Sequence, residues 1–371
     1  MMRLSLSVSG AALALLASTP AAAFDRIYLV DGSIVEKAEI ESEDLLKVVY
    51  EVEGERGKKE SPTERVLRVE YTKQPDEIAA AAVDAEAGAL LGAIAGYQNY
   101  LGSLGDGGDR KFGWAPAYAR YRLVELHQRQ NAIEDMVAAV DDLVANNPDS
   151  RYVPLALIQK FETQLLNEDR AGASATATAL ADLVRSKSLP QRWQYEQRLR
   201  EILSGDKLSG TAYESALQSI SSDAAIFPTV VNRADVATAE SLLSRSEFSA
   251  AEEMFRSVTE SPNADDATLA AAWTGLGDCL YRRAEAKAAG GDAEGAAELF
   301  NEAKLAFMRV VVLYRYQLAY VPKSAFYAGR CIQEIGGDLS RDQSNKLFSF
   351  VTRNFRSSRW AGSAREFRRR N

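Results

Sequence analysis

The feature that most limits how this chain can fold is a helical pattern that repeats in its second half. The units Gly277-Asp278-Cys279 and Gly329-Arg330-Cys331 place the same small residues 52 positions apart. A small residue followed four positions later by phenylalanine also recurs, at Ala251, Ala296 and Ser344. One such unit cannot bury its apolar face alone, so neighbouring units stack to form a continuous core. The repetition predicts a mainly α protein, an α-solenoid of stacked helical hairpins.

The helical pattern covers residues 75–371. Pro75, Asp76 and Glu77 suit the first turn of a helix, and beyond them alanine is dense and apolar residues recur at three and four spacings. Segments 115–146, 152–187 and 190–222 each predict a helical pair. With the three later pairs that carry the repeated small and aromatic residues, this gives about six pairs in all. The pattern breaks at eight places: 105–108, 146–148, 189–190, 204–205, 226–228, 261–262, 290–291 and 336–337.

Residues 24–74 carry a different pattern, of short strand-like runs. Asp31-Gly32-Ser33 between apolar runs is a strong hairpin signal, and further runs fall at 46–52 and 66–71. The charged stretch 53–60 predicts a hairpin tip in solvent. The pattern predicts a small β-barrel or curled sheet. A module of so few residues is marginally stable alone, so we expect it to pack on the helices that follow.

The first 23 residues resemble a secretory signal peptide. Arg3 precedes the apolar run 4–16, and Ala21-Ala22-Ala23 precedes Phe24, as export and cleavage require. No cysteine stands near that site to carry a lipid, and no later segment approaches the roughly 20 apolar residues of a membrane span. We therefore expect cleavage near Ala23 and a mature chain in the periplasm or outside the cell, with no transmembrane span.

Trp273, Leu276 and Gly277, followed by Leu280 and Tyr281, match the W-x-x-L-G-x-x-Y opening of a tetratricopeptide repeat, with Leu280 at the usual tyrosine position. The chain resembles that family. The 52-residue spacing exceeds the 34 residues usual there, so we expect longer helices or an insertion near 285–292. Segments 307–314 and 323–331 are similar to periplasmic tetratricopeptide proteins that accompany outer-membrane assembly or the Tol-Pal system. This resemblance implies a cell-envelope protein or peptide segment as partner.

The N-terminal runs resemble small β-modules that begin many exported bacterial repeat proteins. The resemblance lies in residues 29–35, which match a "dGs.v.G" hairpin, and in residues 66–71, which match a "V..I.y" closing strand. Lys37 stands where those modules commonly have glycine.

Stacked hairpins leave a concave groove lined by first helices, where solenoids hold peptides. Counting helical turns from Gly277 and Gly329 predicts the residues that project into this groove. The alternative for each is ordinary packing between hairpins. The predicted groove residues are Asp278, Tyr281, Arg282, Phe326 and Arg330.

A second candidate surface is the C-terminus, which holds seven arginines from residue 353 onward against one acid, Glu366, in a chain of net charge −8. Arg365, Arg368, Arg369 and Arg370 form a predicted basic patch. It is either the solvated face of a capping helix or a site for an acidic partner or anionic lipid, and self-association is a further possibility. The acidic balance of the whole argues against nucleic acid.

The residues give little support to an enzyme. His127 is the one histidine and has no serine or cysteine motif near it, and Cys279 and Cys331 are too few for a zinc site. Asp106 and Asp109 lack the ligand run of a calcium loop. We expect the two cysteines to be packing residues, with a disulfide as the alternative. The sequence thus predicts a non-enzymatic scaffold without metal or cofactor; the alternatives are a glycan-binding accessory or an envelope enzyme with an unrecognised site.

Overall fold

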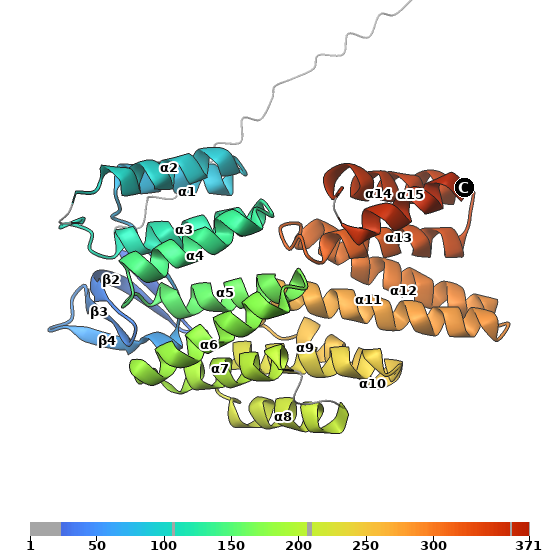
Figure 1. The fold of residues 1–371 in the computed structure, drawn as a ribbon, viewed down its shortest axis with the longest axis horizontal. Coiled ribbons are helices and arrows are strands. Elements are labelled where there is room, and N and C mark those ends of the chain that lie inside the picture. The colour runs from blue at the N-terminus through green and yellow to red at the C-terminus, as the bar shows by residue number, and fades with distance from the viewer. Residues whose placement is uncertain (1–23, 106–107, 206–209, 357, 371) are drawn as a thin grey trace, which may run out of the picture.

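The structure, a computed structural model, describes residues 24–105, 108–205, 210–356 and 358–370. The expected leader at 1–23 and Asp106 lie outside these ranges, as do the side chains of Arg369 and Arg370. A small sheet is followed by a long array of helices (Figure 1). No helix in the described ranges is both long and apolar enough to cross a membrane.

The N-terminal strands form one antiparallel sheet in the order β4-β3-β2-β1-β5. Of the two predicted forms, a barrel or a sheet, the structure has an open sheet with β4 and β5 at its edges. Its buried side chains continue into those of the first three helices, and the sheet and these helices share one core. The strands are β1 (Asp25–Leu29), β2 (Ile34–Glu43), β3 (Lys47–Val52), β4 (Lys59–Pro62) and β5 (Val66–Glu70).

Within the described ranges, an antiparallel helical pair opens the helical array and six further pairs follow it. The sequence predicted these six, and it did not mark the opening pair. The pairs are α1 (Asp76–Glu86) with α2 (Leu90–Ser103), α3 (Ala115–Arg129) with α4 (Ile133–Asn146), α5 (Tyr152–Leu166) with α6 (Arg170–Ser186), α7 (Gln191–Ser204) with α8 (Gly210–Asp223), α9 (Pro228–Ser244) with α10 (Phe248–Thr259), α11 (Asp266–Ala289) with α12 (Ala293–Leu313), and α13 (Val321–Ile335) with α14 (Ser340–Asn354). A last helix, α15 (Arg359–Arg370), packs on α13 and α14.

The long spacing of the glycine units has its cause in helix length. Helices α11 and α12 have 24 and 21 residues, against 15 each for α13 and α14. Within both pairs a glycine of the first helix receives an aromatic ring of the second. A methyl group added to Gly277 would lie 2.7 Å from Phe307, and one added to Gly329 would lie 2.6 Å from Phe348. Close approach at these glycines therefore sets the separation of the helices in each hairpin.

A buried ion pair joins the sheet to the helical array. Arg151 Nε, just before α5, lies 2.7 Å from Glu43 Oε2 on β2, and both side chains are under 5 % exposed. Tyr71 donates a hydrogen bond of 2.6 Å to the same carboxylate and stacks on Trp114, with ring centroids 3.5 Å apart. These contacts fix the sheet against α3 and α5.

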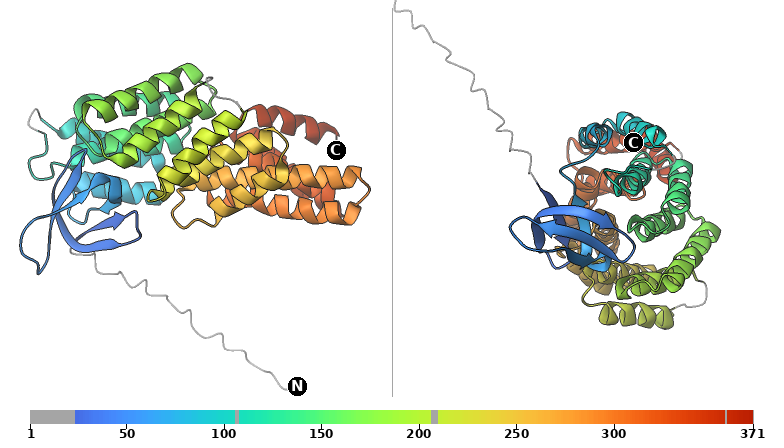
Figure 2. Two further views of the ribbon diagram at one scale, coloured as in Figure 1. Left: turned by 90° about the horizontal axis from the view of Figure 1, so that it is seen from below. Right: turned by 90° about the vertical axis from the view of Figure 1, so that its left-hand side faces the viewer.

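The helical pairs wind around a common axis, so that late elements return toward early ones (Figure 2). The connection between α12 and α13, residues 314–320, meets the end of α3. There the Arg129 guanidinium lies 4.2 Å from the centre of the Tyr316 ring. Arg129 also donates a hydrogen bond of 3.1 Å to the carbonyl of Ala85 at the end of α1. The winding thus encloses part of the concave side of the solenoid.

Candidate functional site

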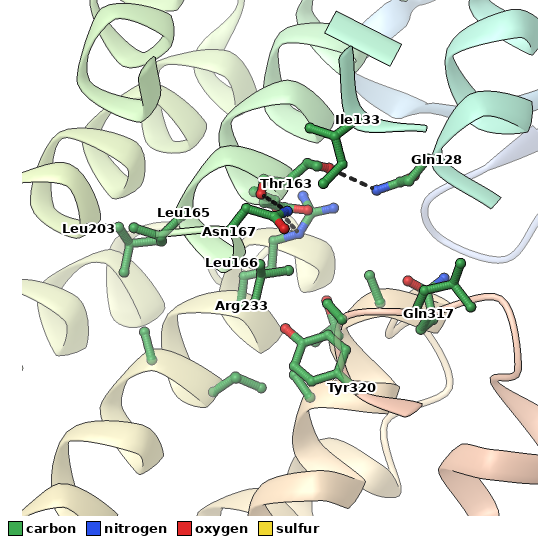
Figure 3. A pocket seen from close by; sticks show the side chains of 18 of the residues that line it. Gln128, Ile133, Thr163, Leu165, Leu166, Asn167, Leu203, Arg233, Gln317 and Tyr320 are labelled. Carbon is green, nitrogen blue, oxygen red and sulfur yellow. Dashed lines mark hydrogen bonds and ion pairs between the residues drawn. The ribbon is translucent and has the colours of Figure 1, made fainter. Parts of the chain in front are cut away.

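The first helices of successive pairs line a pocket on the concave side, which we call the concave pocket. Its volume is about 170 Å³. Helices α3, α5, α7, α9 and α11 and the start of α4 form the helical walls, and the α12–α13 connection forms the remaining side. In Figure 3, Gln317 and Tyr320 of that connection face Leu166 and Arg233. The apolar lining includes Ile133, Leu165, Leu166, Leu203, Val236, Ala237, Ala271 and Leu318.

The floor of the concave pocket is a cluster of paired charges, which we call the ionic cluster: Glu162, Glu196, Arg200, Arg233 and Asp265. Arg200 bridges Glu196 and Glu162, the latter at 2.6 Å. Arg233 contacts Glu196 at 3.0 Å, Asp265 at 2.7 Å and Glu162 at 3.3 Å. The cluster therefore ties together α5, α7, α9 and the start of α11.

Electrostatics favour the charged form of two acids of the ionic cluster, Glu196 and Asp265. Burial opposes ionisation of Glu196, but Arg200 and Arg233 outweigh it and keep the pKa of this carboxyl below its ordinary value. Burial likewise opposes ionisation of Asp265, whose pKa is lowered by Arg233 and by the amide of Thr268. Asp265 accepts that 2.9 Å hydrogen bond as the N-cap of α11. Both arginines are thus already neutralised by carboxylates.

Two further polar groups line the pocket without a partner. Neither the Glu240 carboxylate on α9 nor the Tyr320 hydroxyl has a hydrogen bond or ion pair with any described residue. Glu240 is exposed where it lines the pocket, and the protein around it still removes enough water to raise the pKa of its carboxyl. The nearby cation Lys323 lowers that pKa, yet Lys323 is itself paired with Asp278.

The structure places two of the five predicted groove residues in the interior. The Tyr281 ring is 1 % exposed and lies 5.3 Å from Phe300 and 5.0 Å from Tyr327, centroid to centroid. Phe326 is 4 % exposed and packs on Trp360 at 5.4 Å. Both rings therefore pack between helices, as in the alternative of ordinary packing, instead of projecting into an open groove.

The polar groove candidates lie apart from the concave pocket lining. Asp278 is mostly buried and pairs with Lys323 of α13. Arg282 is exposed and pairs with Glu285 at 2.9 Å. Arg330 pairs with Glu334 at 2.9 Å and lies over Phe367 of α15. A partner-binding role for these side chains stays a prediction.

In the predicted basic patch on α15, Arg365 and Arg368 are exposed. Arg369 and Arg370 belong to the helix, but their side chains lie outside what the structure describes. The opposite face of α15 packs against α13, where Phe367 lies 5.6 Å from Phe326. The patch therefore occupies the outer face of a capping helix, and its binding role stays a prediction.

The side chains that the sequence offered for catalysis or metal binding lie on different elements of the fold. Cys279 and Cys331 are free thiols in the core, and burial raises the pKa of Cys279 to about 12. His127 is half-buried on α3, and burial lowers its pKa. Asp109 accepts hydrogen bonds of 2.9 Å from the amides of Lys111 and Phe112, which stabilise its loop. Within the described ranges, no group of three His, Cys, Asp or Glu side chains is arranged to hold a metal ion.

Sequence reasoning did not single out the residues that line the concave pocket. The signal for this pocket in the sequence is weak, because Glu162 and Glu240 stand on different helices, Tyr320 stands in a connection, and none of them belongs to a local motif. Asp265 stands at the N-cap of α11, where an acid is common, so its type alone does not indicate a pocket.

Comparisons with known proteins leave the chain without an assigned family. No family model matches it, and neither does any curated protein. Among solved structures, it is similar to a signal transduction ATPase with numerous domains that has a tetratricopeptide-repeat sensor, from Pyrococcus horikoshii. The match has 9 % sequence identity and a TM-score of 0.41, and covers 76 % of this chain and 41 % of that one. The chain thus spans less than half of that protein, and the description of the fold rests on the helices themselves.

Proposed function

We propose that this protein is a non-enzymatic scaffold that holds a segment of another protein in the concave pocket. The observation that carries the proposal is the composition of the pocket lining, in which four consecutive first helices, α5, α7, α9 and α11, and the start of α4 place apolar side chains around a charged floor. Peptide segments bind solenoids on such concave faces. Apolar walls supply affinity, while a few polar groups fix orientation.

The pairing of the floor charges supports a scaffold. Arg200 and Arg233 are engaged by three carboxylates, so these charges hold four helices in register. Breaking a buried pair of this kind costs about 3–5 kcal/mol, because it leaves the other charge uncompensated. A rigid concave surface binds with less loss of conformational freedom than a mobile one.

Photo-crosslinking tests this proposal at the pocket itself. A p-benzoyl-phenylalanine in place of Leu166, which is 45 % exposed on the pocket wall, should form adducts with a polypeptide in the native host. The same group in place of Leu91, 76 % exposed on α2, is the matched control and should not give those adducts. Identical adducts from both positions, or none from position 166, would refute binding in the pocket.

We propose further that the protein acts in the bacterial cell envelope, after export. Support comes from Arg3, the apolar run 4–16 and Ala21-Ala22-Ala23, and from the resemblance of segments 307–314 and 323–331 to periplasmic tetratricopeptide proteins. Fractionation with N-terminal sequencing tests it. A periplasmic or secreted chain that begins at Phe24 is expected, and an intact N-terminus in the cytoplasm would contradict export.

A further inference from the structure

We propose that the concave pocket accepts one lysine or arginine side chain of the bound segment, with the Glu240 carboxylate as its counter-ion. This inference rests on the proposed function, because it names the chemistry of the segment that the scaffold holds. The side chain that supplies the cation belongs to a segment of a different protein.

The size of the pocket limits what can enter it. A volume of about 170 Å³ is close to that of engineered cavities, about 150 Å³, that admit a benzene ring. This space holds one long side chain, and a whole helix does not fit. The rest of a bound segment would therefore lie along the concave surface outside the pocket.

The charges around the pocket select the sign of that side chain. An anionic group would meet Arg200 and Arg233, but both guanidinium groups are already bound by Glu162, Glu196 and Asp265. These five groups carry a net charge of −1 when ionised, and the buried Arg192, which acts on Glu196, balances it, so the floor holds no unpaired arginine for an anion. A cation displaces nothing when it pairs with Glu240, since no described residue bonds to that carboxylate.

The cation nearest to Glu240 in the protein is also already committed. Lys323 acts on the Glu240 carboxyl, but its ammonium group is bound to Asp278, so the two charges cancel. Glu240 therefore stays as an uncompensated acid inside a concave surface. A cation that enters the pocket replaces water on this exposed carboxylate, and the protein around the pair strengthens their attraction.

The walls suit the carbon stem of a long cationic side chain. Leu203, Val236 and Ala237 line the pocket on the helices that carry Glu240 and its neighbour α7. Lysine and arginine bury their methylene groups against such surfaces while the charged head reaches a polar group. The Tyr320 ring and hydroxyl, which line the same pocket, offer an aromatic face for the cation and an oxygen that can accept a hydrogen bond.

Methyl NMR on the purified protein, at neutral pH and low salt, tests the inference. The probes are three capped tripeptides with a central lysine, glutamine or glutamate between two leucines. We expect the lysine peptide to shift the methyl signals of Ile133 and Leu166, and to bind at least tenfold more tightly than the other two. Glu240→Gln should weaken the lysine peptide at least tenfold. Glu253→Gln, which removes an exposed charge on α10 outside the pocket lining, should leave it unchanged.

Several results would overturn the inference. Equal binding of the lysine and glutamine peptides, or tighter binding of the glutamate peptide, contradicts a cation site. Absence of any shift up to about 10 mM peptide contradicts it as well, and adducts at position 166 then decide separately whether segments bind at all. If Leu166→Gln weakens the peptides while Glu240→Gln does not, segment binding stands and the cation site falls. Self-association that Glu240→Gln abolishes would place the cation on a second copy of this chain and refute the assignment to a different protein.

Discussion

Gly329→Ala tests whether close approach of a ring to a helix sets the hairpin geometry. The new Cβ atom would lie 2.6 Å from Phe348 Cε1, and ordinary carbon contacts are 3.5–4.0 Å. The ring must therefore move by about 1 Å, although it is completely buried. Overpacking of this size costs about 1–3 kcal/mol, and alanine in a helix returns about 1 kcal/mol relative to glycine. We expect a net destabilisation of about 1 kcal/mol.

The sign of the effect decides between packing and helix propensity. Urea unfolding followed by far-UV circular dichroism gives the free energy of unfolding, and amide exchange in α13–α15 shows whether the loss is local, since solenoids can unfold in parts. Gly362→Ala on α15 is the matched control, because no atom lies within 4 Å of its added Cβ. It should stabilise by about 0.5–1 kcal/mol. A similar gain at position 329 would refute the packing argument.

Three further predictions concern the sheet and the ionic cluster. Lys37 has a φ of 57°, a left-handed conformation that glycine adopts more easily than lysine. Lys37→Gly should therefore raise the free energy of unfolding by up to about 1 kcal/mol in urea titrations. A lower free energy of unfolding would show that the contacts of the lysine side chain matter more. Arg151→Met leaves Glu43 buried without its cation and should destabilise by about 3–5 kcal/mol in the same assay; a loss under about 1 kcal/mol would contradict a buried pair. Because the pKa of Asp265 is lowered in the folded state, its stabilising contribution is present above pH 4 and is lost as the pH falls through the folded value. Asp265→Asn should flatten that acid loss in pH-dependent unfolding, and an unchanged pH profile would count against the pairing with Arg233.

The helical breaks that the sequence predicted lie between helices, at places where proline or glycine stands. The sequence did not predict the turns inside several of the hairpins. Asn131, Glu168 and Ser246 explain why. Each follows the end of a first helix and adopts a φ of 58° to 65°, where glycine is the usual residue. The chain reverses there without the residue that normally signals a reversal. The pairs were still recognised from their lengths and from the small and aromatic residues that recur in them.

The site was harder to predict than the fold, because the periodicity of a first helix does not show which face is free. Of the 24 residues of α11, 12 are buried, since neighbouring pairs pack on most sides of this helix. Tyr281 and Phe326 satisfy the spacing of a groove face, yet they meet Phe300 and Trp360 inside the stack. The concave pocket instead depends on how far the array curves, and this curvature cannot be predicted from the sequence of a single repeat.

Curvature also determines which side of the concave pocket is held least strongly. Four ion pairs of Arg200 and Arg233 join different helices of the floor, whereas the α12–α13 connection meets α3 through the ring of Tyr316 and the guanidinium of Arg129. A cation–π contact at a partly exposed position stabilises by about 0.5–1 kcal/mol. Buried ion pairs resist separation several times more strongly. The contact of Tyr316 with Arg129 is therefore the weaker of these two links around the pocket, while Tyr314 and Tyr320 of the same connection pack on the core of the last pairs.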